Sequence, residues 1–188
     1  MDVNETITVR YRIDARQSRF VVRAEASGLL SVFGHNPVIA VRGFGGDARF
    51  NADDPRQTSL LMLVQADSLA VVGEVSEKDR LEIERMMRAE VLETARYPEI
   101  VFMSRSIALN RTAENNYRAR ITGSLSLHGA TRDEVIAAQV AVNGERLRAQ
   151  GEFTLRQSDY NIKPVSAMGG TLKVRDEVKL SFDISALA

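Results

Sequence analysis

The 188-residue chain contains no cysteine, and this absence excludes both a disulfide framework and a thiolate site. The chain also has no excess of either charge, since 25 Lys and Arg residues balance 25 Asp and Glu residues. General nucleic-acid and anionic-membrane binders need a basic excess, so no nucleic-acid partner is expected. No apolar run approaches the roughly 20 residues that a membrane-spanning helix needs, so no membrane span is expected.

A secretory signal is also missing from the start of the chain. The opening segment MDVNETITVRYRID has neither the basic region nor the apolar region of a signal peptide. We therefore expect a cytoplasmic protein, or a periplasmic one if the sequence is a trimmed mature chain. Hydrophobic residues make up 44% of the chain, enough for a sizeable core, and we expect one domain over residues 1–188.

Patterns that carry catalysis are scarce. His35 and His128 are the only histidines, and no HExxH-type spacing pairs them with carboxylates. No nucleophile-elbow pattern is present, and the glycine-rich stretches do not lie between a strand and a helix. We therefore expect no enzymatic activity, no metal and no cofactor. His35 is expected to be a loop residue bonded to nearby backbone, and His128 an exposed residue at a strand end.

The clearest pattern is the alternation within residues 117–135, YRARITGSLSLHGATRDEV. Apolar or small residues occupy every second position from Tyr117 to Leu127, with polar residues between them. A period of two predicts a half-buried antiparallel strand. Gly123 in the middle indicates a bend or bulge, and the following His-Gly-Ala-Thr segment predicts a hairpin turn.

Similar alternation predicts further strands at 7–13, 19–25, 38–42, 47–50, 99–106, 135–142, 147–155 and 178–184, and a nearly all-apolar run predicts one at 59–69. Turn-forming residues gather at 14–18, 51–55, 110–116 and 143–145. Sequential strands joined by short turns favour a meander, and closing such a sheet removes its exposed edges. We therefore predict a mostly β protein, an antiparallel β-barrel of about eight strands.

One amphipathic helix is predicted over residues 76–93, SEKDRLEIERMMRAEVLE, with Ser76 as its N-cap. A narrow stripe that is expected to pack down recurs at the helical period: Ile83, Met86, Met87, Glu90 and Val91. The strand at 59–69 is apolar on both faces. Its second face is therefore expected to be covered by the helix or by a partner.

The inward faces of these strands leave two alternatives for the interior. Large apolar residues would form a packed core, as small barrels usually do. Small residues on the same faces would instead leave volume for a long apolar ligand: Ala24, Ala66, Ala119, Gly123, Ala149 and Gly151. The residues alone leave both alternatives open.

Four segments, in order, carry a resemblance to a known family. The opening YRIDARQSRFVVRA and the central TSLLMLVQADSLAV match its strand patterns. A Tyr-Pro-x-Ile-x-Phe-x-Ser pattern falls on Tyr97, Pro98, Ile100, Phe102 and Ser104. A Gly-x-Leu-x-Leu-His-Gly-x-Thr pattern falls on Gly123, Leu125, Leu127, His128, Gly129 and Thr131. By these segments the chain resembles the YceI-like family.

The resemblance implies a lipocalin-like β-barrel with an elongated apolar tunnel that binds a polyisoprenoid or similar lipid. It also implies a homodimer, which is common in the family, and no catalytic machinery. The chain differs from the family pattern in its long helix. It differs again in the apolar segment GLLSVFGHNPVIAVRGF, where a Gly-His-Asn-Pro loop stands in place of a continuous strand.

We therefore expect a protein that binds or carries an apolar small molecule, an isoprenoid or other lipid-like chain, inside the barrel. The alternative is a barrel with a filled core that acts as a structural or protein-interaction module. A polar head group is expected at a mouth near His35, Asn36 and Lys163. The predicted apolar ligand-binding residues are Phe20, Val22, Phe44, Met62, Val64, Phe102, Ile121, Leu125, Leu127, Phe153, Leu180 and Phe182.

Overall fold

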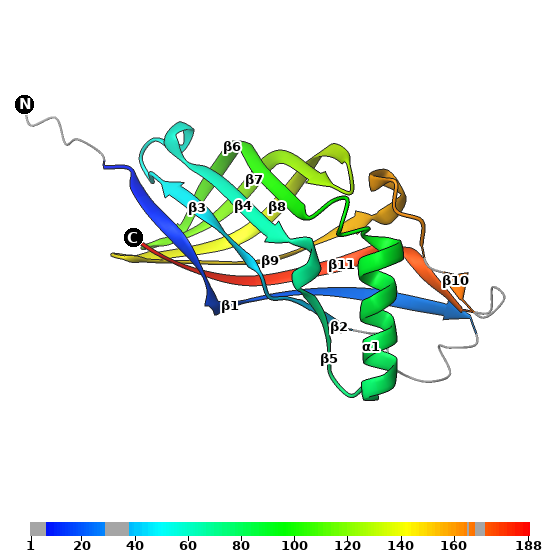
Figure 1. Ribbon diagram of the computed structural model, residues 1–188. Helices are drawn as coiled ribbons and strands as arrows, with labels where there is room; N and C mark the ends of the chain where they lie inside the picture. Colours follow the sequence, from blue (N-terminus) through cyan, green and yellow to red (C-terminus); the bar gives the residue numbers. More distant parts are fainter. Residues whose placement is uncertain (1–6, 29–37, 165, 168–171) are drawn as a thin grey trace, which may run out of the picture.

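The computed structural model describes residues 7–28, 38–164, 166–167 and 172–188. Long strands run around a barrel, and one helix stands beside β5 at the end away from the carboxyl terminus (Figure 1). The strands are β1 Val9–Gly28, β2 Val38–Val41, β3 Phe44–Phe50, β4 Ser59–Gln65, β5 Leu69–Val72, β6 Glu99–Ala113, β7 Asn116–Leu127, β8 Ala130–Asn143, β9 Arg146–Arg156, β10 Ser166–Ala167 and β11 Leu172–Leu187. The helical segments are η2 Pro55–Gln57, η3 Ala66–Ser68, α1 Glu77–Met86, η4 Met87–Val91 and η5 Gln157–Tyr160.

The sheet closes on itself. Its strands are hydrogen bonded in the order β10-β11-β9-β8-β7-β6-β4-β3-β1-β2-β5, and a further antiparallel pairing joins β1 to β11. The eight strands from β11 round to β1 therefore form a closed antiparallel barrel, as the alternation predicts. Each of these eight strands pairs with a neighbour on both sides, and β2, β5 and β10 extend the wall at one end.

Residues 14–18 form a bulge within β1, so the prediction of a turn at this position is wrong. β1 stays continuous through this stretch, while its register against β11 shifts. The Asp14 carboxylate accepts hydrogen bonds from the Arg16 backbone N–H at 2.9 Å and from the Gln17 side chain at 2.8 Å. These local bonds are typical of turns, but β11 pairs with β1 on both sides of them. The strand therefore bends without reversing.

The predicted turn at 110–116 is also too long. β6 and β7 remain paired as far as Ala113 and Asn116, so only Glu114 and Asn115 link them. The side chains at the end of this hairpin are exposed on both faces, and their polar composition does not distinguish a solvated strand end from a turn. Pairing between the two strands decides the boundary.

The predicted helix exists, but its last turn has an unexpected geometry. Ser76 caps the helix, because its Oγ accepts a hydrogen bond from the Asp79 N–H at 3.1 Å. Residues Met87–Val91 form a π-helical turn, in which the Leu92 N–H donates to the Met87 carbonyl at 2.9 Å. Such turns are rare and have no simple sequence signal. In the part of the chain that the structure describes, no helix has the length and apolar character needed to cross a bilayer.

The predicted hairpin between β7 and β8 is confirmed. Leu127 pairs with Ala130, so only His128 and Gly129 form the connection. Their φ angles are 50° and 75°, both positive. Two-residue hairpins of type I′ require this backbone, because it matches the right-handed twist of the paired strands.

The second apolar face of β4 stays exposed on the outside of the barrel. Leu61 and Leu63 are 37% and 41% exposed, and Met103 on β6, which pairs with Leu61, is 54% exposed. The expectation that the helix covers this face is wrong, since α1 packs against β5 instead. Coverage by a partner stays a prediction.

Candidate functional site

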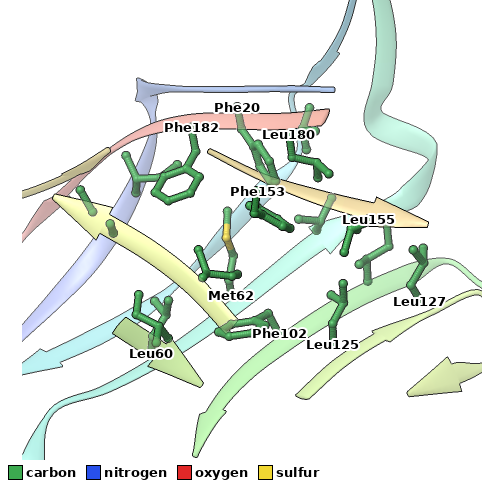
Figure 2. A pocket seen from close by; sticks show the side chains of 18 of the residues that line it. Phe20, Leu60, Met62, Phe102, Leu125, Leu127, Phe153, Leu155, Leu180 and Phe182 are labelled. Atoms are coloured by element: carbon green, nitrogen blue, oxygen red, sulfur yellow. The ribbon is translucent and has the colours of Figure 1, made fainter. Parts of the chain in front are cut away.

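The inward side chains of the barrel enclose a cavity of about 270 Å³. Figure 2 shows side chains from opposite strands pointing toward this space, among them Phe20, Met62, Phe102, Phe153 and Phe182. Polar side chains are few among the described lining residues: Arg49, Thr58, Ser59, Arg156, Gln157 and Tyr160. The interior is therefore an apolar chamber, in which the burial of apolar surface is the main available driving force for binding.

The structure places almost all of the predicted apolar residues in this lining. Every one of them except Phe44 lines the cavity. Phe44 packs edge to face against Phe20, with ring centroids 6.0 Å apart, and so supports the lining from behind. Lys163 is exposed and does not line the cavity. His35 and Asn36 lie outside the described residues, and ligand binding by any of these residues stays a prediction.

Sequence reasoning missed the lining residues that come from outside the long strands. Met87 and Val91 of η4 line the cavity, as does Leu92, the next residue. Tyr160 of η5 and Ile162, two residues later, line it as well. The helical stripe already contained Met87 and Val91, so the packing signal was present. What the stripe could not show is that these residues pack over a cavity.

The two mid-strand glycines accommodate aromatic rings. A Cβ on Gly123 would lie 2.7 Å from Phe102 Cζ, and a Cβ on Gly151 would lie 2.6 Å from Phe182 Cζ. The expectation that these glycines leave volume for a ligand is therefore wrong, because a neighbouring ring already fills each space. The expected small residues that do line the cavity are Ala24, Ala119 and Ala149, whereas Ala66 does not.

Packed aromatic side chains lie at the end of the cavity near the β6–β7 hairpin. Phe50, a lining residue, packs against Tyr117 with ring centroids 5.2 Å apart. Tyr11 is only 1% exposed, and its hydroxyl donates to the Gly144 carbonyl at 2.9 Å. A buried phenol with a satisfied hydroxyl is stable in such a position. These contacts close this end of the barrel.

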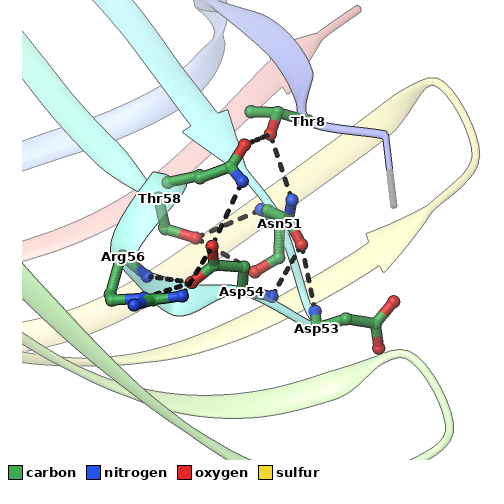
Figure 3. Close-up of polar contacts among 7 residues, drawn as sticks. Thr8, Asn51, Asp53, Asp54, Arg56 and Thr58 are labelled. Carbon is green, nitrogen blue, oxygen red and sulfur yellow. Dashed lines mark hydrogen bonds and ion pairs between the residues drawn. The ribbon is translucent and has the colours of Figure 1, made fainter. Parts of the chain in front are cut away.

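The loop after β3 completes the closure and is held by its own hydrogen bonds (Figure 3). The Asn51 side chain is buried, and its oxygen accepts from the backbone N–H groups of Asp53 and Asp54 at 3.1 and 2.8 Å. Its amide nitrogen donates to Thr8 at 3.1 Å. Thr58 lines the cavity and donates its hydroxyl to the Asn51 carbonyl at 3.2 Å. A buried polar cluster with its groups paired in this way fixes the loop.

The opposite end is formed by η4, η5 and the β7–β8 turn. His128 lies here and is 8% exposed, so the expectation of an exposed histidine is wrong. Its Nε2 lies 2.8 Å from a Glu93 carboxylate oxygen, and its Nδ1 lies 3.2 Å from the Tyr160 carbonyl oxygen. The Tyr97 ring packs against the imidazole with centroids 4.6 Å apart. All three partners are at least 31 positions away in the chain, so no local pattern reveals this burial.

Tyr160 makes a further polar contact at this end. The Tyr160 hydroxyl donates to Glu134 at 2.6 Å. Burial, reinforced by Glu134, raises the pKa of Tyr160 well above its usual value, so the phenol stays protonated at neutral pH. Within residues 7–28, 38–164, 166–167 and 172–188, no group of three or more acidic or histidine side chains could hold a metal ion. The polar groups at this end therefore pair with one another and leave the cavity lining mostly apolar.

The barrel resembles two solved structures over nearly its whole length. Burkholderia cenocepacia BcnA superposes with a TM-score of 0.71 at 18% identity, covering 92% of this chain and 98% of that one. A polyisoprenoid binding domain from Saccharophagus degradans superposes with a TM-score of 0.67 at 14% identity, covering 95% and 98%. At these identities the likeness shows a shared fold.

Sequence comparison identifies the family. A UPF0312 protein of Pseudomonas savastanoi pv. phaseolicola is 28% identical over 145 residues, which are 73% of this chain and 68% of that protein. Residues 11–186 match the profile of the YceI-like domain. This range includes the whole closed barrel, except for the first two residues of β1 and the last residue of β11. The chain therefore belongs to the YceI-like domain family.

Proposed function

We propose that this protein binds an apolar small molecule, such as an isoprenoid or another lipid-like chain, inside the barrel. The observation that carries the proposal is the cavity of about 270 Å³ with an almost wholly apolar lining. The Saccharophagus degradans domain of the same fold is described as polyisoprenoid binding, which supports the proposal. Burial at roughly 25 cal/mol per Å² of apolar surface would hold such a molecule without directional contacts.

The cavity also sets the size of the ligand. The volume of about 270 Å³ limits the length of apolar chain that fits wholly inside the barrel. A longer chain would have to extend through one end or displace side chains.

A second candidate function is a protein-interaction module, and one observation favours it. Leu61, Leu63 and Met103 form an exposed apolar face on β4 and β6. Exposed apolar patches often mark interaction sites. This function needs no ligand in the cavity, so a direct test of cavity binding separates the two.

The test compares two alanines on the same strand. Ala138 lines the cavity, whereas the neighbouring Ala137 is exposed on the outer face. Ala138→Phe should fill part of the cavity and weaken binding of the neutral apolar fluorophore N-phenyl-naphthylamine by about tenfold or more. Ala137→Phe should leave the affinity unchanged. Fluorescence titration measures both, and circular dichroism confirms that each variant is folded.

The same experiment shows when the proposal fails. If the unaltered protein does not bind the fluorophore, and native mass spectrometry with organic extraction finds no lipid, the cavity is not a binding site. If both phenylalanine variants lose affinity equally, the fluorophore binds elsewhere, and the exposed face on β4 and β6 becomes the better candidate.

A further inference from the structure

We infer that α1 and η4 form a side gate in the barrel wall, latched by the Glu93–His128 contact, through which the apolar ligand reaches the cavity. This inference rests on the proposed function for the identity of what passes, but the gate itself is a property of the fold. It rests on a gap in the strand pairing, on the contacts that hold the helix in that gap, and on backbone strain at the latch.

The gap lies next to β5. Before the chain reaches β5, β4 pairs with β6, from Leu61 opposite Met103 to Gln65 opposite Glu99. Beyond that point η3 turns the chain aside, and β5 pairs with β2 but with no other described strand. The free edge of β5 would open the cavity to water at this point, because a barrel is closed only where its strands are paired.

The helix occupies this position. α1 packs beside β5 (Figure 1), and Met87, Val91 and Leu92 present apolar side chains to the cavity. The segment thus takes the place of a strand as the local wall. A helix that packs on its neighbours through side chains separates from the wall without breaking a ladder of backbone hydrogen bonds, whereas a strand of the barrel does not.

Polar contacts hold the helix on its β5 side. The Glu84 carboxylate accepts a hydrogen bond from the Val71 backbone N–H at 2.9 Å and pairs with Arg88 at 3.1 Å. Arg88 Nε in turn donates to the Asp67 carbonyl at 3.2 Å. These bonds satisfy groups of β5 and of the preceding turn that none of the described strands pairs, so this side is the attachment of the gate.

Among the described residues, one polar side-chain contact joins the far side of the gate to the barrel rim, beside the packing of Tyr97 on His128. Glu93, just past η4, meets His128 of the β7–β8 turn at 2.8 Å. The His128 Nδ1 lies 3.2 Å from the Tyr160 carbonyl oxygen, and this second contact positions the ring at the rim. A hydrogen bond to a carboxylate is shorter and stronger than one between neutral groups, so the Glu93–His128 contact can hold this end of the helix.

The Glu93–His128 contact coincides with backbone strain at Glu93. Glu93 has φ of 45°, in the left-handed region that follows a helix end and that glycine usually occupies. His128 is also left-handed, with φ of 50°. A glutamate in this conformation is unfavourable for the backbone alone, and it persists here with its side chain on His128. The adjoining π-helical turn is a second irregularity of the kind found at functional sites.

The experiment measures exchange of N-phenyl-naphthylamine by stopped-flow fluorescence. Glu93→Gly removes the latch and also relieves the backbone strain, so it should not weaken the helix end by itself. We expect the association and dissociation rate constants to rise together, by about fivefold to tenfold for a half-exposed charged hydrogen bond, with little change in affinity. His128→Asn, which tolerates the left-handed backbone, is the second variant if the first does not fold.

The matched control is Glu82→Gln. Glu82 pairs with Arg85 at 2.8 Å on the same helix, and both side chains are more than half exposed. Its rate constants should match those of the unaltered protein. Equal acceleration in this control would show general loosening of the helix and would overturn the latch. Unchanged rates in folded Glu93→Gly, or a loss of affinity with unchanged association, would overturn it as well.

Hydrogen exchange tests the gate without any ligand. The Leu92 amide, bonded to the Met87 carbonyl at 2.9 Å, should exchange faster in Glu93→Gly, while amides in the paired part of β7 and β8 stay unchanged. If the unaltered protein binds no fluorophore but Leu92 exchange accelerates, the gate stands and the proposed ligand fails. If Leu92 exchange is unchanged, the gate fails whatever the cavity binds.

Discussion

Replacement of Gly123 by alanine tests the close contact between a strand and the ring beneath it. A Cβ at this position would lie 2.5 Å from the Met103 carbonyl oxygen and 2.7 Å from Phe102 Cζ. The ring can rotate toward the cavity, but the carbonyl belongs to the paired strand β6 and can move only by distorting the ladder. The substitution therefore strains the backbone of the barrel wall.

The magnitude follows from two opposing effects. Overpacking against a backbone atom costs about 2–3 kcal/mol. Loss of glycine freedom in the unfolded chain returns roughly 0.4–1 kcal/mol. The net destabilisation is about 1–2.6 kcal/mol, which lowers Tm by roughly 2–10 °C in a chain of this size. Displacement of Phe102 into the cavity should also weaken binding of N-phenyl-naphthylamine.

Gly45 provides the matched control within the chain. It also lies in a strand, but no heavy atom lies within 4 Å of the position its Cβ would take. Gly45→Ala should leave Tm unchanged or raise it slightly. Thermal unfolding followed by circular dichroism compares the two variants. Equal Tm values for the two would refute the argument that Gly123 is required by close packing.

Two further predictions concern polar groups. Asn51→Ala should lower the free energy of unfolding, measured in urea, by about 2–4 kcal/mol, because the backbone N–H groups of Asp53 and Asp54 lose their buried acceptor. A change below about 0.5 kcal/mol would contradict the argument that these bonds fix the loop after β3. The hydrogen bond from Arg148 lowers the pKa of Asp183 below its usual value. The pair therefore stabilises the fold at pH values above the pKa that Asp183 has in the unfolded chain. This stability is lost as the pH falls through the lower pKa that Asp183 has in the folded protein. Asp183→Asn should therefore lose less stability on acidification below about pH 4 than the unaltered protein, measured by denaturant unfolding at several pH values; parallel curves would exclude this contribution.

The sequence by itself determined which side chains point into the barrel. Along a strand, successive side chains face opposite sides, so alternation fixes the inward set from local spacing alone. This is why Met62, Phe102 and Leu180 could be assigned to the interior before any pairing was known. The His128-Gly129 turn was equally local, because a two-residue hairpin demands residues that tolerate a positive φ.

Pairing between distant segments decided the features that the sequence misassigned. The segment at 14–18 forms local bonds typical of a turn, yet β11 pairs with β1 on both sides of it and keeps one bent strand. Gly123 and Gly151 leave no open volume, because Phe102 and Phe182 occupy the space beside them. Such outcomes depend on which strand lies opposite, and no window of the sequence contains that information.

The candidate site divides in the same way. The apolar lining follows from strand alternation, but the position of the helix over the unpaired edge of β5 and the burial of His128 do not. Glu93 and His128 are 35 residues apart, and each has an ordinary local role, one at a helix end and one in a turn. Only closure of the barrel brings them together, since the contact exists where the helix meets the β7–β8 rim.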